Sequence, residues 1–521
     1  MTVATLTAGA VVLTAPSAQA LRGTSTASAT ATVTAGATSA RAPAGQAVRA
    51  APSSTPRAFT AAELALLNQR MADNHAMDKG RMLPAGAGLR LNAPLPEPGG
   101  IQPMSTTINR NSTIPNSAIK GGTSFLSSTQ EPSTDANGGN IFQTGNWYAT
   151  RSTNNGATWN YLDPFTLFGS GFCCDQVAQY DAATGRQFWV LQFSDHLVLA
   201  NASASGSGAF TNWCYWNIDA TWYGLPAGTT LDYNDMTIGD SNVYISSNYF
   251  GSSSTGAALL RLPKAPMSTC SGFTYYRINR SDNFTFKLVP GSTSTLYFGS
   301  NWGQTNGSSF RLFAWPESSG SYSYWDRTVT SYGFYTRNSG QNCASADGVV
   351  SNWCQFADSR VLGAYLSSGT IAFSFNAKQD GSHPFPYTRI VRFRESDKAY
   401  LSSSDMWGSW GALQFLSLAP NSTGLAGGVV AWGGGTGTTH YYPGSATYST
   451  PANSLALGPN YFLGGAGNPC TSGGIPRWGD YLTVRTYKAD TRQWIGAGYA
   501  MHGGSCGSTG AYPEPHNVQF S

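Results

Sequence analysis

The sequence predicts an all-β protein, a seven-bladed β-propeller preceded by a disordered leader and one short helix. Two observations lead to this prediction. The 521 residues include 60 Gly and 27 Pro, 13% are aromatic and only 11% are charged, which suits short strands and tight turns better than helices. In addition, a small unit recurs, made of an apolar strand, a polar turn and a second strand. Repeats of about 40 to 50 residues, lengthened by loops, are typical of propellers.

The composition also excludes two classes of protein. A formal net charge of +4 is too small for a chain of this length to be a nucleic-acid binder. The sequence contains no apolar run of about 18 residues, the length that a membrane span requires. We therefore expect neither a nucleic-acid partner nor a membrane span.

Residues 1–20 are predicted to be an export signal. They carry no charge, and an apolar Ala/Thr-rich stretch is followed by Pro16-Ser-Ala-Gln-Ala20, a small-x-small pattern typical of a cleavage site. Because no Lys or Arg precedes the apolar part, the alternative is a disordered Ala/Thr tail. With the signal, we expect a secreted, extracellular protein.

Two further segments precede the repeats. Residues 21–57 consist almost entirely of Ala, Thr, Ser, Pro, Gly and Val with four Arg, a composition that cannot bury a core and predicts a disordered leader. Residues 58–120 are predicted to hold a short helix and an extended linker. The helix is indicated by a capping box from Thr60 to Glu63 and by apolar residues at near-helical spacing up to Met71.

Eight cysteines, without the spacing of a zinc site, suit disulfides in an exported protein. Proximity along the chain predicts three bonds, Cys214–Cys270, Cys343–Cys354 and Cys470–Cys506. The adjacent Cys173 and Cys174 are left to bond each other or to stay reduced, and the alternative is that each bonds a distant partner.

Residues 121–521 are predicted to form the propeller, because seven copies of the unit fall within them. Their starts are Glu131, Asp175, Asp235, Lys287, Asp358, Gln414 and Asp480. The alternative architecture is a pair of β-sandwiches with irregular hairpins.

One turn resembles a family motif. Ser152-Thr-Asn154-Asn-Gly156-Ala-Thr158-Trp159 is similar to the Asp-box, Ser-x-Asp-x-Gly-x-Thr-Trp, with Asn154 at the Asp position. The resemblance is to the secreted sialidase-like (Asp-box or BNR) β-propeller superfamily. It implies a hairpin turn on the outer edge of a blade, in which the Asx side chain accepts backbone N–H groups, the Gly has a positive φ and the Trp packs inward.

Charged residues at equivalent positions of the units should ring one mouth of the central channel. The candidate catalytic residues are Glu131, Asp175, Asp235, Asp358, Asp480 and Tyr481. The candidate substrate-binding residues are Arg360, Arg477, Trp478, Lys287 and Tyr180. Carboxylates that face one cavity repel one another, so they must share protons, bind a cation or pair with bases.

Three interpretations of these acids remain open. In the first, an acid of raised pKa protonates a leaving oxygen, and a second acid or a Tyr such as Tyr180 or Tyr481 acts as base or nucleophile, as in glycoside hydrolysis. In the second, the acids hold Ca²⁺ or Mg²⁺ through oxygen ligands. In the third, each Asp ties its strand to the next blade through backbone N–H groups.

The functional hypothesis is a secreted carbohydrate-active enzyme, a glycoside hydrolase or polysaccharide lyase, that cleaves an extracellular glycan at the channel mouth as a monomer. Aromatic and planar polar side chains beside the acids suit sugar rings. Arg477 is placed to bind a uronate or sialate carboxylate, or else to pair with Asp480. The alternative function is a non-catalytic propeller that binds a glycan or a protein.

Overall fold

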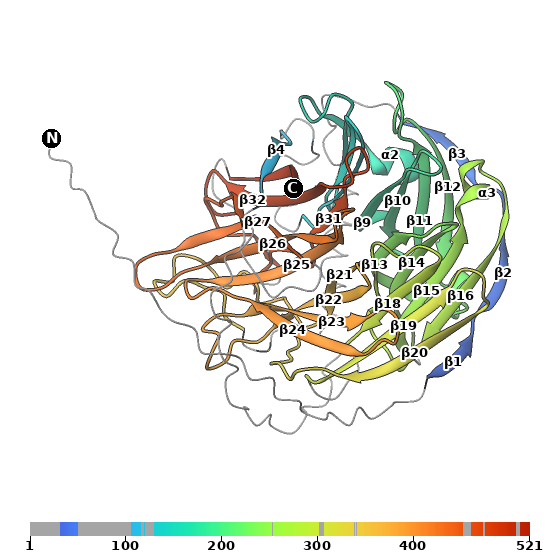
Figure 1. The fold of residues 1–521 in the computed structure, drawn as a ribbon. Helices are drawn as coiled ribbons and strands as arrows, with labels where there is room; N and C mark the ends of the chain where they lie inside the picture. Colours follow the sequence, from blue (N-terminus) through green and yellow to red (C-terminus); the bar gives the residue numbers. More distant parts are fainter. Residues whose placement is uncertain are drawn as a thin grey trace. The chain divides into compact units, whose positions relative to one another are not determined.

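Seven antiparallel β-sheets stand around a common centre in the computed structural model (Figure 1). The structure describes residues 32–50, 106–115, 119, 130–169, 171–252, 254–301, 307–337, 339, 341–451, 460–472, 475–506 and 511–521. Each sheet contains the four strands of one blade, and three sheets carry a fifth strand. The predicted seven-bladed propeller is therefore confirmed. The predicted export signal and the predicted helix lie outside the described residues.

The first four blades follow one another along the chain. Blade 1 contains β5 (Ser133–Asn137), β6 (Asn140–Thr144), β7 (Ala149–Ser152) and β8 (Asn160–Leu162). Blade 2 contains β9 (Phe172–Asp181), β10 (Arg186–Phe193), β11 (His196–Ser203) and β12 (Asn212–Asp219). Blade 3 contains β13 (Thr230–Ile238), β14 (Asn242–Phe250), β15 (Thr255–Pro263) and β16 (Phe273–Arg280). Blade 4 contains β17 (Lys287–Leu288), β18 (Thr295–Ser300), β19 (Ser309–Pro316) and β20 (Ser321–Thr328).

The last three blades complete the ring. Blade 5 contains β21 (Val361–Ser367), β22 (Thr370–Ala377), β23 (Tyr387–Arg394) and β24 (Tyr400–Met406). Blade 6 contains β25 (Ala412–Pro420), β26 (Leu425–Gly434), β27 (Tyr441–Pro451) and β28 (Asn460–Leu463). Blade 7 contains β31 (Thr483–Thr486), β32 (Trp494–His502), β33 (Tyr512–Phe520) and, from the N-terminal part of the chain, β4 (Ile108–Thr113).

Short elements connect the blades. They are the helix α2 (Pro164–Phe168), the 3₁₀ turn η2 (Ala220–Tyr223), and a ribbon of β29 (Thr471–Ser472) and β30 (Ile475–Pro476), whereas the helix α3 (Lys264–Ser268) joins β15 to β16 within blade 3.

The innermost strands lie at the positions that the repeat predicts. Each of the seven predicted starts lies in an innermost strand or within three residues of its first residue. The innermost strands contact one another in chain order, and β31 of blade 7 contacts β5 of blade 1. The ring is therefore closed.

One apolar core fills each interface between neighbouring blades. Strand β10 shows how the sequence encodes this packing. Phe188 and Val190 face the core shared with blade 3, and Trp189 and Leu191 face the core shared with blade 1. Successive side chains of a strand point to opposite faces, so a strand between two cores is apolar at every position.

Blade 7 is completed by the N-terminal strand β4. Residues from Ile108 to Thr113 pair with β33 at the C-terminal end of the chain. Part of the segment predicted as a linker, residues 58–120, is thus the outer strand of a blade. The two ends of the propeller meet in one sheet, which fastens the ring.

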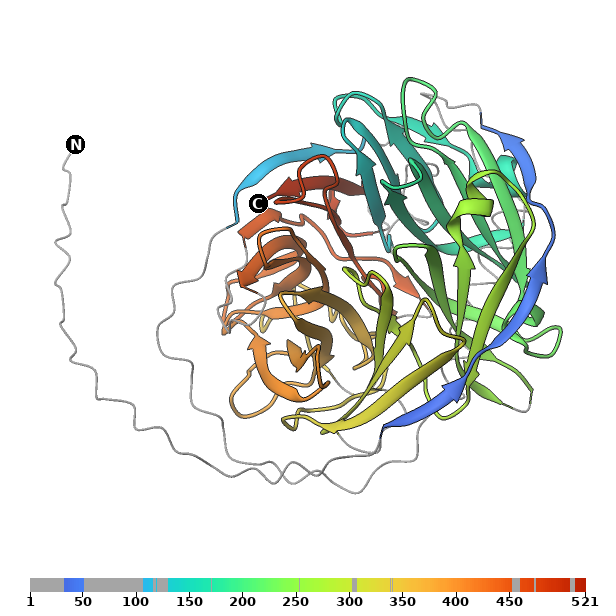
Figure 2. The same ribbon diagram turned by 45° about the vertical axis from the view of Figure 1, so that its right-hand side comes forward.

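Part of the predicted disordered leader is ordered, which corrects that prediction for residues 32–50. Strands β1 (Val33–Gly36), β2 (Thr38–Ala42) and β3 (Gln46–Arg49) pair with β20, β16 and β12, the outer strands of blades 4, 3 and 2 (Figures 1 and 2). We call residues 32–50 the strap. A strand added to a sheet edge is held by backbone hydrogen bonds, so it needs no apolar core of its own, and its composition does not reveal it.

The strap is also held by contacts outside its strand pairing. Trp216 donates from Nε1 to the carbonyl oxygen of Pro43 at 3.1 Å, and the N–H of Gly45 donates to the carbonyl oxygen of Cys270 at 3.0 Å. Ala42 and Ala50 are buried in two of the cores between blades. The strap is therefore an integral part of these three blades.

The three disulfides that proximity predicts are present, together with a fourth. They are Cys173–Cys174, Cys214–Cys270, Cys343–Cys354 and Cys470–Cys506. The first two cysteines, for which alternatives remained open, bond each other at the start of β9.

The turn between β7 and β8 has the geometry expected of it. Asn154 Oδ1 accepts the N–H of Thr158 at 2.9 Å, and Ser152 Oγ accepts the N–H of Gly156 at 2.9 Å. Gly156 has a φ of 78°, and Trp159 is buried. The role of this turn is structural, because these hydrogen bonds satisfy polar groups of the turn itself.

Candidate functional site

The charged residues at the starts of the innermost strands come together at one end of the channel. Each innermost strand is the first strand of its blade, so all seven starts lie at the same end. The charged side chains at this end of the channel interact with one another through ion pairs or through space. They belong to Glu131, Asp175, Asp235, Lys287, Asp358, Arg360, Arg477 and Asp480. We call these residues, with Arg337 described below, the channel cluster.

Glu131 and Asp175 form a hydrogen-bonded carboxyl pair between blades 1 and 2. Only 1% of Glu131 and 8% of Asp175 is exposed. Burial raises the pKa of Asp175 well above its usual value, and the neighbouring charge of Glu131 raises it further. Burial and Asp480 also raise the pKa of Glu131, whereas Arg477 and the hydrogen bond from Asp175 lower it. Asp175 therefore carries the proton that the pair shares.

Asp480, at the start of blade 7, titrates in the opposite direction. Burial alone raises its pKa, but Arg337, Arg477 and Arg360 outweigh burial and hold the pKa below its usual range. Arg337 Nη2 pairs with Asp480 Oδ2, and Arg477 Nη2 lies 3.3 Å from the same oxygen. The Asp480 N–H donates to Glu131 Oε1 at 2.9 Å, which joins it to the carboxyl pair.

Asp358 is held by two arginines. Arg360 donates from Nε and Nη2 to its carboxylate at 2.9 and 2.7 Å, and Arg337 Nε lies 3.5 Å from Oδ2. The guanidinium of Arg360 also lies 4.5 Å from the centre of the Tyr233 ring. Arg360 is thus bound by residues of its own chain.

Asp235 fulfils the structural interpretation of the acids. Its Oδ2 accepts the N–H of Leu288 at 3.0 Å, which ties β13 to the innermost strand of blade 4. The same oxygen lies 3.1 Å from Lys287 Nζ. Burial lowers the pKa of Lys287 and Asp235 partly opposes this shift.

Arg337 is a functional candidate that the repeat pattern of the sequence does not reveal. It lies in the long connection from residue 329 to 360, between blades 4 and 5, and it contacts both Asp358 and Asp480. A register of strands cannot find a residue between the units. The sequence does mark this connection in another way. The longest step between predicted unit starts, from Lys287 to Asp358, contains two cysteines.

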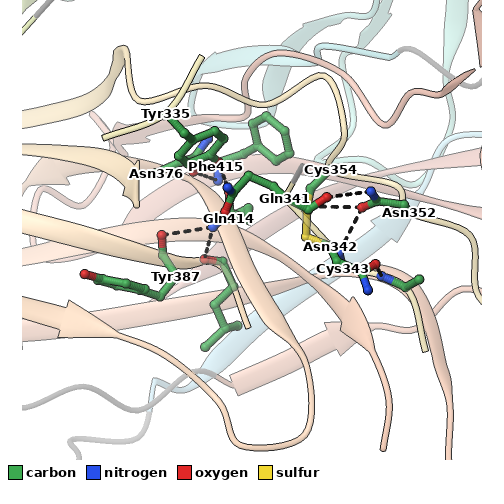
Figure 3. Close-up of a disulfide and its surroundings, with 12 residues drawn as sticks. Tyr335, Gln341, Asn342, Cys343, Asn352, Cys354, Asn376, Tyr387, Gln414 and Phe415 are labelled. Carbon is green, nitrogen blue, oxygen red and sulfur yellow. Dashed lines mark hydrogen bonds between the residues drawn. A yellow bond between two sulfur atoms is a disulfide. The ribbon is translucent and has the colours of Figure 1, made fainter. Parts of the chain in front are cut away.

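The connection that carries Arg337 is fixed in place on both sides (Figure 3). Asn352 Oδ1 accepts the N–H of Cys343 at 2.8 Å, and Asn352 Nδ2 donates to the carbonyl oxygen of Gln341 at 2.6 Å. Tyr335 donates from its hydroxyl to Gln414 Oε1 of blade 6 at 2.8 Å. With the Cys343–Cys354 bond, these contacts place Arg337 without a strand.

Three aromatic candidates differ in their positions. Tyr481 contacts the Tyr233 ring at 5.9 Å between centres, and burial raises its pKa well above the usual value, so its hydroxyl stays protonated. Trp478 is 2% exposed and stacks on Tyr499 at 4.0 Å. Tyr180 is buried in the core between blades 1 and 2. Neither Trp478 nor Tyr180 offers a ring face to a sugar.

Strained backbone occurs at the same end of the channel. Glu131, Tyr233 and Phe415 have φ values of 41°, 54° and 61°. Tyr233 and Phe415 lie where the register of β13 and β25 shifts. Such conformations cost about 1–3 kcal/mol each and are concentrated at functional sites. The fold thus maintains unfavourable geometry around the channel cluster.

The donor set suits cationic side chains better than a divalent metal ion. Within the described ranges, no three His, Cys, Asp or Glu side chains are grouped as ligands of one ion. Asp235, Asp358 and Asp480 each pair with Lys or Arg instead. Ca²⁺ and Mg²⁺ need several oxygen ligands around one point.

Comparison with solved structures finds neighbours at low sequence identity. No family model and no curated protein matches the chain. An α-L-arabinanase of Penicillium chrysogenum is 10% identical, with 80% of this chain and 98% of that chain covered and a TM-score of 0.36. The ulvan lyase of polysaccharide lyase family PL25 is 9% identical (76% and 93% covered, TM-score 0.36). The endosialidase of phage phi92 is 8% identical (79% and 69% covered, TM-score 0.37). At these values, the reactions of these proteins are not transferred to this chain.

No helix in the described part of the chain is long and apolar enough to span a bilayer.

Proposed function

We propose that the protein is a secreted carbohydrate-active enzyme, a glycoside hydrolase or polysaccharide lyase, that acts on an extracellular glycan at the channel cluster. One observation carries the proposal. Glu131 interacts with the carboxyl group of Asp175 and accepts the backbone N–H of Asp480, and the environments of these two acids drive their pKa values apart, upward for Asp175 and downward for Asp480. Neighbouring acids held in opposite protonation states are the arrangement that acid–base catalysis requires.

The chemistry assigns a role to each group. Protonated Asp175 donates its proton to the leaving glycosidic oxygen as the C–O bond breaks, and the Glu131 carboxylate stabilises the charge that develops. In hydrolysis, water then adds to the anomeric carbon and returns a proton to the carboxyl pair. In elimination, the Glu131 carboxylate removes the proton from the sugar ring, and transfer within the pair returns that proton to Asp175. The pair is restored at the end of either cycle.

The arginines favour an anionic glycan. Arg337 and Arg477 lie together at Asp480, and Arg360 is close enough to lower the pKa of the same carboxyl group. Guanidinium groups bind carboxylates and sulfates through parallel hydrogen bonds. A uronate, sialate or sulfated sugar is therefore the expected substrate class.

Burial favours a second candidate function, a propeller that binds a glycan or a protein without cleaving it. Glu131 and Asp358 are 1% and 4% exposed, and each already pairs with an arginine. In that case the cluster stabilises the channel, and the ligand binds elsewhere on the blades.

Single substitutions distinguish the two functions. The purified protein is screened on acidic and neutral polysaccharides for new reducing ends and for the ultraviolet absorbance of unsaturated sugars. Asp175→Asn and Glu131→Gln are expected to lower turnover at least about 100-fold. The matched control is Asp397→Asn, which removes a carboxylate that is 52% exposed and paired with Arg394. If both folded variants keep full turnover, the catalytic assignment is wrong.

A further inference from the structure

Arg485 is a buried cation that has no partner of opposite charge in contact with it. It lies on β31, the innermost strand of blade 7, and is only 6% exposed. Its Nη1 donates to the carbonyl oxygen of Val484 at 3.3 Å, and its Nε has no hydrogen-bond partner. Among the described residues, none forms an ion pair with it. A buried charge is costly unless it is paired, so this guanidinium calls for a ligand.

Arg485 borders a cavity of about 20 Å³ in the channel. The other polar residues of the lining are Lys287, Asp235, Tyr233, Tyr481, Thr483 and Ser417. A cavity of this size holds one sphere the size of a water molecule. Sulfate, phosphate and the carboxylate of a sugar are too large for it.

The charged side chains that line the cavity are two cations, Arg485 and Lys287, and one acid, Asp235, so the lining itself carries one positive charge in excess. Lys287 and Asp235 form an ion pair at 3.1 Å, so their two charges cancel. Asp135 acts on Arg485 only through space, and Lys488 acts on Asp135 in the same way. Both Asp135 oxygens accept backbone N–H groups, from Ala136 and Tyr180.

We propose that the cavity binds one monovalent halide ion, chloride under natural conditions, between Arg485 and Lys287. The ion balances the positive charge of Arg485 and accepts hydrogen bonds from hydroxyl groups of the lining. A water molecule fills the same space but leaves the guanidinium charge uncompensated. This site is separate from the carboxyl pair Glu131–Asp175, and it does not depend on the proposed enzymatic function.

The titration behaviour agrees with this site. Burial lowers the pKa of Arg485 and of Lys287, with acids of the channel only partly opposing the shift. Burial raises the pKa of Tyr233 and Tyr481 well above the usual value. Both tyrosines therefore keep their protons and remain hydrogen-bond donors to an anion.

Anomalous diffraction from crystals of the full chain grown in sodium bromide tests the proposal directly. We expect one bromide peak in the channel, within contact distance of Arg485 and Lys287. A channel without a peak, or bromide at the protein surface only, overturns the proposal. This readout needs no substrate, so it is independent of the proposed function.

A second measurement uses thermal unfolding. In wild-type protein we expect the midpoint to rise by about 2 °C when chloride replaces gluconate at constant ionic strength. Arg485→Met should lose this rise, whereas Arg485→Lys should keep part of it. The control is Arg261→Met, which removes another buried arginine, bound to the carbonyl oxygens of Pro316 and Ser319, and should leave the chloride response unchanged. A wild-type midpoint that ignores chloride contradicts the proposal even if a variant fails to fold.

Discussion

Replacing Asp175 by Asn is expected to stabilise the folded protein at neutral pH. Burial and Glu131 raise the pKa of Asp175 well above its usual value. An acid whose pKa is higher in the folded state binds its proton more tightly there, so stability falls as pH rises from the unfolded pKa to the folded pKa. Asn cannot ionise, and its amide donates to Glu131 as the protonated carboxyl group does.

The magnitude follows from linkage. Below about pH 4 the carboxyl group is protonated in both states, and the two proteins should be equally stable. Above that pH the wild type loses about 1.4 kcal/mol per pH unit until the pH reaches the raised pKa of Asp175. The advantage of Asp175→Asn grows at the same rate and then becomes constant.

Urea unfolding at several pH values between 4 and 8 measures this difference. Asp480→Asn is expected to change the stability in the opposite direction, because the pKa of Asp480 is lowered by Arg337 and Arg477. Its ionised form stabilises the fold above about pH 4, and this contribution disappears as pH falls through the lowered pKa. Near pH 7, Asp480→Asn should cost about 3–5 kcal/mol, the usual effect of removing one partner of a buried ion pair. A loss of stability in Asp175→Asn at pH 7, or an advantage that does not change with pH, would refute the reasoning.

Three further substitutions test the scaffold. Gly45→Val should cost about 1–3 kcal/mol in urea unfolding and expose the strap to proteases, because a Cβ there would lie 2.8 Å from the Trp216 ring; unchanged protease resistance would contradict this. Replacing Cys214 and Cys270 by Ser should lower stability by about 4 kcal/mol, since their bond closes a loop with a sequence separation of 56; a loss below about 1 kcal/mol would not fit. Trp478→Ala should cost about 3–5 kcal/mol, and a selective rise in KM without loss of stability would instead return Trp478 to the substrate site.

The blades could be predicted from the sequence because each one repeats a local pattern. Asp175 and Asp235 lie in innermost strands where the repeat places them. Chain proximity sufficed for three of the four disulfides, since each joins cysteines at most 56 residues apart, whereas proximity leaves the partners of Cys173 and Cys174 open. Spacing along the chain therefore indicates both the blades and these three disulfides.

The strap and Arg337 could not be predicted in the same way. The strap pairs with blades 2 to 4 through backbone groups, which every residue except proline offers equally. Arg337 reaches Asp480 through a connection whose course depends on contacts with Gln414 and Asn352. Such contacts exist only after the blades have formed. For Trp478 the sequence could not separate a core tryptophan from an exposed one.

The pairing of β4 with β33 has a consequence for the biosynthesis of the protein. About 400 residues separate the two strands, and ribosomes add roughly 5–20 residues per second. The N-terminal strand is therefore made about 20–80 s before its partner. During this interval β4 has an unpaired edge available to other chains, so chaperones or export in an unfolded form should raise the yield of native protein more than they would for a propeller closed within one hairpin.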